Sequence, residues 1–172
     1  MSNQKSERFV DFVLEKIHKR GDKGFAAKLK KADNETTEYQ SWEILSQWAD
    51  LEDEKARRAY GLIGACLARG KKPTDGTLGL GSALHAVSQE KQEAGAAEDS
   101  SAAARLRRIL ACKDSLELID ILRPLLHFLE SKEINISKAR LLDEILWFNN
   151  DSSRERTRTR WAQEFYGHKE DA

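Results

Sequence analysis

The stretch from Ile136 to Tyr166 constrains the fold more than any other part of the chain. Its apolar side chains recur at helical spacing in two segments, and a polar run at residues 149–153 separates them. Ser137 is expected to cap the first segment, and Ser152, with Glu155 three residues later, the second. The pattern predicts two helices, each with one apolar face.

The composition extends this prediction to the whole chain. Leu, Ala, Glu, Lys and Arg dominate, while only two Pro and ten Gly occur among 172 residues, a balance that favours helices. No segment alternates apolar and polar residues over a useful length. We therefore predict an all-α protein, a compact bundle of about eight or nine short to medium helices in a single domain over residues 1–172.

Several residues suggest where helices begin, end or bend. Residues 70–79, rich in Gly, Pro and Thr, and residues 88–100, which lack apolar periodicity, are expected to be mobile loops. Asp50 is expected to cap a helix that ends at Gly70. Pro124 should make the helix that starts near residue 115 kink or restart, because proline removes an amide hydrogen bond.

Two local patterns carry more specific predictions. Gly61 and Gly64 lie inside a predicted helix, where glycine is unfavourable, so close approach of another helix is expected at these positions. Asp114 and Glu117 have the spacing of a reciprocal cap at a helix start.

The charge balance and the cysteines limit the classes of protein. Acidic and basic residues number 29 each, so a nucleic-acid site would require charges segregated onto one face. Cys66 and Cys112 are isolated in apolar contexts and are expected to be reduced core thiols of a cytoplasmic protein. The polar N-terminus and the absence of an apolar run of about 18 residues predict no signal peptide and no membrane span.

No catalytic motif is present. The chain lacks a Cys-x-x-Cys pair, a phosphate loop and a nucleophile elbow. Glu15 and His18 have the spacing of one half of a di-metal helical site, but the second Glu-x-x-His pair is missing. We predict no catalytic residues, no cofactor and no metal; a di-metal enzyme of the helical class is kept as an alternative.

Basic residues nevertheless gather in clusters. The clusters are Lys28, Lys30 and Lys31; Lys55, Arg57 and Arg58; Arg69, Lys71 and Lys72; Arg105, Arg107 and Arg108; and Arg154, Arg156, Arg158 and Arg160. Each alone is also typical of a solvated helix face. Together they predict at least one phosphate-binding surface that follows a nucleic-acid backbone without reading bases. A helical adaptor whose basic clusters meet acidic proteins is the alternative.

Large aromatic side chains accompany the last cluster. Trp147, Trp161, Phe165 and Tyr166 could stack on unpaired bases. The helical spacing of Trp161 with Phe165, and of Ala162 with Tyr166, favours a face turned to the core. We predict core packing for these aromatic residues.

Several of these segments resemble one protein family. The motifs are Arg105-Leu-Arg-Arg-Ile-Leu, Leu122-Arg-Pro-Leu-Leu, Leu141-Leu-Asp-Glu-Ile-Leu-Trp and Arg160-Trp-Ala-Gln-Glu-Phe-Tyr. With residues 42–70 and 79–84 upstream, they resemble in order and content the CasB family, the small subunits of the type I-E CRISPR surveillance complex, Cascade. The resemblance covers most of residues 8–166.

This resemblance implies an all-helical, non-catalytic subunit that is present in two copies beside other Cascade subunits. Such a subunit contacts the backbone of the CRISPR RNA–target DNA hybrid and steadies the displaced DNA strand, which stabilises the R-loop. The positions that match the family's nucleic-acid face are Lys30, Lys31, Lys55, Arg58, Arg105, Arg108, Arg123, Arg154 and Arg158. The family often has arginine where this chain has Lys30, Lys31 and Lys55, and lysine lacks the bidentate fork.

Overall fold

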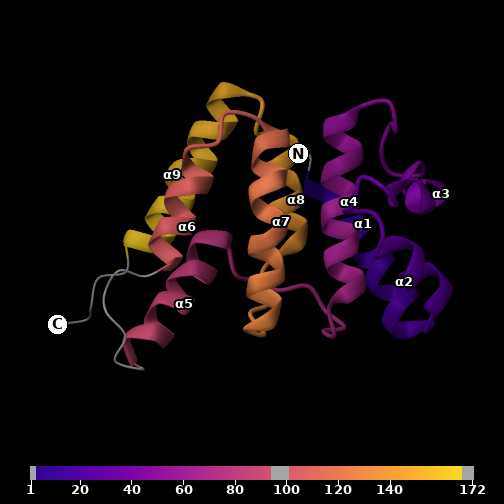
Figure 1. The fold of residues 1–172 in the computed structure, drawn as a ribbon, viewed down its shortest axis with the longest axis horizontal. Coiled ribbons are helices and arrows are strands. Elements are labelled where there is room, and N and C mark those ends of the chain that lie inside the picture. The colour runs from indigo at the N-terminus through magenta and orange to yellow at the C-terminus, as the bar shows by residue number, and fades with distance from the viewer. Residues whose placement is uncertain (1–2, 94–100, 168–172) are drawn as a thin grey trace. The chain divides into compact units, whose positions relative to one another are not determined.

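The structure, a computed structural model, describes residues 3–93 and 101–167, in which helices are joined by turns and loops (Figure 1). The α-helices are α1 (Asn3–Leu14), α2 (Lys23–Leu29), α3 (Trp42–Leu45), α4 (Glu54–Arg69), α5 (Leu80–Glu93), α6 (Ser101–Leu110), α7 (Ser115–Ser131), α8 (Lys138–Leu146) and α9 (Asp151–Tyr166). A π-helical turn, η1 (Glu15–Lys19), and a 3-10 turn, η2 (Glu38–Ser41), complete them. The predicted all-α class and helix number are confirmed.

The chain divides into two compact units. The first comprises Met1–Gly76 with Lys138–Leu146, and the second comprises Thr77–Ser137 with Trp147–Ala172. The chain therefore passes between the units three times. The single domain expected from the sequence stays a prediction.

The first unit packs α1, α4 and α8 around an aromatic cluster. The ring of Phe9 on α1 meets Tyr60 on α4 edge-on at 4.9 Å and Trp48 at 5.4 Å. Phe9 and Tyr60 are buried, as is the apolar face of α8. These buried side chains form the core of the first unit.

The two glycines in α4 allow α2 and the turn after it to approach closely. A Cβ atom on Gly61 would lie 2.8 Å from the carbonyl oxygen of Ala32, and one on Gly64 would lie 2.8 Å from Cδ1 of Leu29. Contacts this short do not occur between real side chains, so the neighbouring segment would have to move. The predicted close approach of another helix is confirmed at Gly64, whereas at Gly61 the close neighbour is the turn that follows α2.

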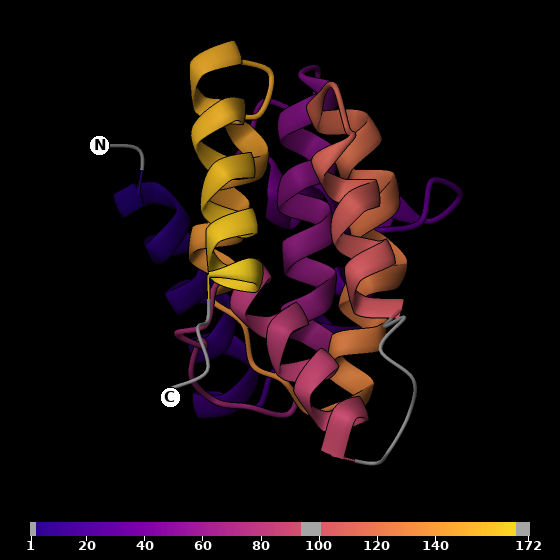
Figure 2. The same ribbon diagram turned by 90° about the vertical axis from the view of Figure 1, so that its left-hand side faces the viewer.

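The second unit packs α5 against both α9 and α6, and α6 against α7 (Figure 2). Trp161 on α9 is fully buried and stacks on Phe148, with ring centroids 6.1 Å apart. Gly81 on α5 lies directly against the backbone carbonyl of Trp161, so α5 and α9 touch through their backbones. A side chain at position 81 would separate these two helices.

Several helix ends differ from the prediction. Asp53 caps α4, because the chain turns at Asp50, whose carboxylate accepts from Glu52 N instead. α5 continues to Glu93, so residues 88–93 of the predicted loop at 88–100 are helical. Residues 94–100 lie outside the described residues. α7 does not restart at Pro124, which lies on an exposed side where one lost hydrogen bond costs least.

The predicted caps at two helix starts have different outcomes. Asp114 accepts from Glu117 N at 2.9 Å, and the Glu117 carboxylate accepts from Lys113 N at 2.8 Å, so this reciprocal cap is confirmed. Asn150, and not Ser152, caps α9 by accepting from Ser153 N at 2.9 Å.

A loop residue supplies the cap of α8. The two carboxylate oxygens of Asp75 accept from Lys138 N at 2.8 Å and from Ala139 N at 3.1 Å. Just beyond, Ser137 N donates to the carbonyl oxygen of Leu78 at 2.8 Å, and Leu78 and Ile136 form an isolated bridge. Residues 70–79 are outside the helices as predicted, but their C-terminal part is anchored to the segment before α8.

Replacing Asp75 with alanine should lower the free energy of unfolding by about 2 kcal/mol, because two amide groups at a helix start lose a charged acceptor. Urea denaturation, monitored by circular dichroism, measures this free energy of unfolding. Asp75→Asn keeps one acceptor and should lose about half as much. Equal stability of wild type and Asp75→Ala would contradict the anchoring role.

Candidate nucleic-acid interface

α6 carries three arginines outside its buried positions, and Arg105 and Arg108 are one turn apart. Ala102, Leu106 and Ile109 are fully buried, whereas Arg107 and Arg108 are exposed and Arg105 is half-buried. The helix contains no acidic residue. Within the described parts of the chain, no carboxylate forms an ion pair with Arg105, Arg107 or Arg108. We call these three residues the α6 arginine face; it keeps its positive charge.

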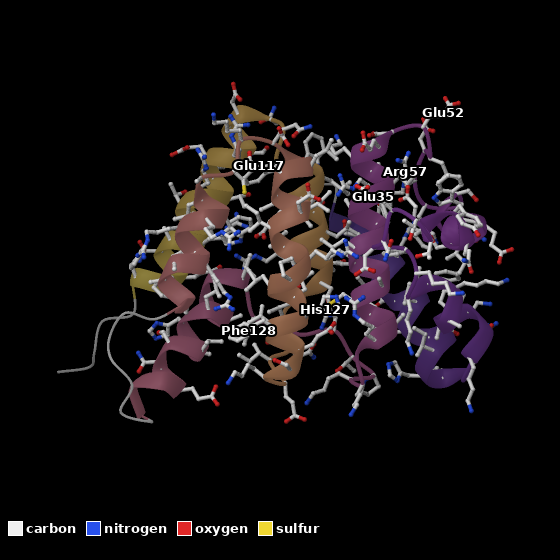
Figure 3. All side chains as sticks on the ribbon, viewed as in Figure 1. Glu35, Glu52, Arg57, Glu117, His127 and Phe128 are labelled. Atoms are coloured by element: carbon white, nitrogen blue, oxygen red, sulfur yellow. The ribbon has the colours of Figure 1, made fainter. Side chains whose placement is uncertain are left out.

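One residue of this face is held by an aromatic ring. The guanidinium carbon of Arg105 lies 4.0 Å from the centroid of Phe128 on α7, and Lys132 Nζ lies 6.0 Å from the same ring. Figure 3 shows Phe128 on the flank of α7 next to α6, on the same flank as Glu117. Two cations from different helices therefore meet at one ring.

Arg123, on the exposed side of α7, also forms no ion pair with a described residue. It adds to the positive charge of the second unit. Arg105, Arg108 and Arg123 are thus the predicted site residues of this unit whose charges are not compensated within the described chain.

The two predicted residues on α9 are held in the fold instead. Arg154 donates to the carbonyl oxygen of Phe148 at 3.2 Å and pairs with Asp151 at 2.7 Å. Arg158 donates to the carbonyl oxygen of Cys112 at 3.1 Å, and Glu155 lies 3.9 Å from it. The acids three residues before each arginine are the sequence signal for this pairing.

Arg156 belongs to the same basic cluster but is not one of the two predicted site residues on α9. It is exposed and contacts only the hydroxyl of Ser153, at 3.3 Å, among described residues. No acid lies three or four residues before it, which is the signal that distinguishes it from its neighbours.

The remaining predicted residues lie in the first unit. Lys30 is exposed at the end of α2, and Lys31 donates to the side chain of Gln40 at 2.7 Å. Lys55 is half-exposed in the first turn of α4. Arg58 is near Glu54 and Glu35, at 3.9 and 4.0 Å. The predicted site is therefore divided between the units, and one continuous positive surface stays a prediction.

The thiols do not offer a nucleophile. Burial, followed by the nearby Glu117 carboxylate, raises the pKa of the Cys112 thiol from 9.0 to about 11. Cys112 is therefore protonated at neutral pH, and Cys66 is buried as well. A buried neutral thiol is a poor nucleophile.

The two residues of the di-metal alternative, Glu15 and His18, are not joined by a third ligand among the described residues. Glu15 pairs with Arg20 at 3.7 Å, in the same turn as His18. Across residues 3–93 and 101–167, no three His, Cys, Asp or Glu side chains are grouped so that they could hold a metal ion. None of the described helices has the length and hydropathy to cross a membrane.

The aromatic residues near α9 separate into two pairs. Trp161 and Phe165 are buried, which confirms their predicted core packing. Trp147 is 50% exposed and Tyr166 is 58% exposed, so the prediction was wrong for these two. Trp147 lies in the turn between α8 and α9, and Tyr166 is the last residue of α9, where the periodicity of a helix no longer determines orientation.

The described helices define an all-α protein in which α6 carries three arginines that form no ion pair with a described residue. The family model of CRISPR-associated protein Cse2 matches residues 26–166, and the chain belongs to this family. No curated protein sequence matches it significantly.

Solved structures share the fold. CasB from Thermus thermophilus is 24% identical, with a TM-score of 0.68 over 95% of this chain and 98% of that one. CasB from Thermobifida fusca is 17% identical, with a TM-score of 0.66 over 94% and 98% of the two chains. A chain described as "CRISPR RNA-guided surveillance complex" is 16% identical, with a TM-score of 0.69 over 97% and 94%.

Proposed function

We propose that this protein is a non-catalytic subunit of an RNA-guided CRISPR surveillance complex of type I-E, and that it binds nucleic-acid backbone without sequence specificity. The observation that carries the proposal is the α6 arginine face, which has three guanidinium groups and no acidic partner among described residues. Membership of the Cse2 family and the fold shared with a chain of a surveillance complex support it.

The proposed role fits the energetics of guided recognition. Pairing of guide and target supplies specificity, and exchange of DNA duplex for hybrid is nearly balanced, so modest backbone contacts shift the equilibrium. A chain with zero net charge binds weakly alone, and binding strengthens when several subunits act together. The partners we propose are the CRISPR RNA–target DNA hybrid, the displaced strand, other Cascade subunits and a second copy of this chain.

The predicted residues have different parts in this proposal. Arg105, Arg108 and Arg123 contact phosphate directly, because no acid among described residues compensates them. Further contacts with phosphate come from the first unit, through Lys30, Lys31, Lys55 and Arg58. On α9, Arg154 and Arg158 bind phosphate with the N–H groups that their internal hydrogen bonds do not use.

The test is binding of the isolated protein to fluorescent single-stranded DNA of two unrelated sequences across a range of salt concentrations. We expect weak binding that is equal for both sequences. The logarithm of the binding constant should fall linearly with the logarithm of salt concentration, by about 0.7 for each phosphate contacted. No binding at low salt, with an unchanged R-loop lifetime for Arg105→Glu/Arg108→Glu in the assembled complex, would refute the proposal.

A protein–protein adaptor is the second candidate, and exposed aromatic residues favour it. Trp147, Tyr166 and Tyr39 are large exposed side chains, and aromatic residues are enriched in the cores of protein interfaces. An adaptor would co-purify with partner proteins but would not bind the labelled strand at any salt concentration. The salt titration therefore distinguishes the two candidates.

A further inference from the structure

We infer that Phe128 is a positioning residue, which holds the Arg105 guanidinium ready to bind phosphate. The inference rests on the proposed function and adds a residue that the basic clusters did not include. Its basis is the 4.0 Å distance between the guanidinium carbon of Arg105 and the ring centroid of Phe128.

The packing of α6 and α7 fixes this contact. Leu106, next to Arg105, is fully buried, and Leu125 and Leu129, on either side of Phe128, are almost fully buried. Neither helix can rotate without exposing these residues, so the arginine stem and the ring stay opposite each other. The core therefore fixes the two backbones, and the contact with the ring holds the arginine side chain itself.

The contact leaves the hydrogen-bonding groups of Arg105 available. A guanidinium at this distance from a ring centroid lies over the ring face, and its N–H groups lie around its own edge. No carboxylate among described residues forms an ion pair with it. A guanidinium edge with unused donors matches two oxygens of one phosphate group.

A comparison with α9 shows why an aromatic partner matters. Asp151 and Glu155 hold Arg154 and Arg158 by ion pairs, and each ion pair also cancels a positive charge. Phe128 restricts Arg105 while leaving its charge uncompensated. Restricting the side chain before binding removes an entropic cost that corresponds to about two- to twelvefold in affinity.

Lys132 strengthens the same site. Its ammonium group lies 6.0 Å from the Phe128 ring centroid, and it forms no ion pair with a described residue. The negative face of the ring attracts both cations and reduces the cost of bringing them together. A phosphate near the ring would therefore meet two positive charges, one from α6 and one from the end of α7.

The test is a double-mutant cycle on strand binding, using the full chain and a single-stranded DNA oligonucleotide. Phe128→Leu and Arg105→Gln should each weaken binding by about three- to tenfold. Arg105→Gln should also lower the salt slope by about 0.7, because only this change removes a charge. The double variant should bind like Arg105→Gln alone, because Phe128 acts only through Arg105. Phe128→Tyr, which keeps an aromatic face, should bind like the wild type.

Two results would overturn the inference. If Phe128→Leu weakens binding equally in the Arg105→Gln background, the ring contacts the nucleic acid itself. If Phe128→Leu binds like the wild type at every salt concentration while the wild type binds, the ring does not position Arg105. If the wild type does not bind and the R-loop lifetime of the complex is unchanged by Arg105→Glu/Arg108→Glu, the proposed function fails, which is a distinct outcome. The melting temperature of each variant controls for loss of fold.

Discussion

Replacing Trp161 with alanine should lower the free energy of unfolding of the second unit by about 3–5 kcal/mol. Trp161 is fully buried on α9 and stacks on Phe148 at 6.1 Å. Its backbone carbonyl lies against Gly81 on α5, so the helices cannot move together to fill the space left by the indole. A cavity that cannot collapse gives the upper part of the expected range.

Urea denaturation followed by far-ultraviolet circular dichroism measures this effect, and Trp147→Ala provides the matched control. The same side chain is removed from a position that is half exposed, in the turn before α9. The control should lose less than about 1 kcal/mol. Equal losses in the two variants would contradict the assignment of Trp161 as the centre of this core.

Local patterns predicted the parts of the fold that depend on neighbouring residues. Asp114 and Glu117 are three residues apart and form the cap that this spacing predicts. Gly61 and Gly64 are unfavourable in a helix, and the close approach of α2 explains them. The cap lies within one helix turn, so its spacing was sufficient, whereas the glycines indicated a close approach but not which segment makes it.

The interactions that were missed join residues far apart in the chain. Asp75 caps a helix that begins 63 residues later, and no pattern around either segment indicates this. Phe128 meets Arg105 from another helix, so the basic cluster on α6 alone did not reveal its aromatic partner. Such contacts depend on how helices pack, which hydrophobic periodicity does not determine.

The sequence alone predicts which of Arg154, Arg156 and Arg158 form ion pairs within α9. Arg154 and Arg158 each have an acid three residues earlier, whereas Arg156 has none. An acid at this spacing predicts an ion pair on the same helix face. The uncompensated charge of α6 follows from the same rule, because residues 101–110 contain no acid at all.

Converting Arg105, Arg107 and Arg108 together to glutamine should weaken binding to single-stranded DNA about 100-fold at 0.1 M salt. Three phosphate contacts at about 0.7 each contribute roughly 2 to the salt slope. Over the one decade of salt concentration between 1 M and 0.1 M, a slope of roughly 2 raises the binding constant about 100-fold, and this gain is lost when the three contacts are removed. Glutamine is a good helix former, so α6 should remain folded. Binding measured between 0.05 and 0.5 M salt, about a decade, gives affinity and slope together.

The matched control changes the net charge by the same amount elsewhere. Arg8, Lys19 and Lys23 are exposed residues of the first unit, outside the predicted site, and none forms an ion pair with a described residue. Their replacement by glutamine should leave the salt slope close to that of the wild type, because these side chains contact no phosphate. If both triple variants lose affinity equally, binding depends on net charge alone, and the α6 arginine face is not the binding surface. If only the α6 variant loses it, with an unchanged melting temperature, the local arrangement of arginines on that helix determines binding.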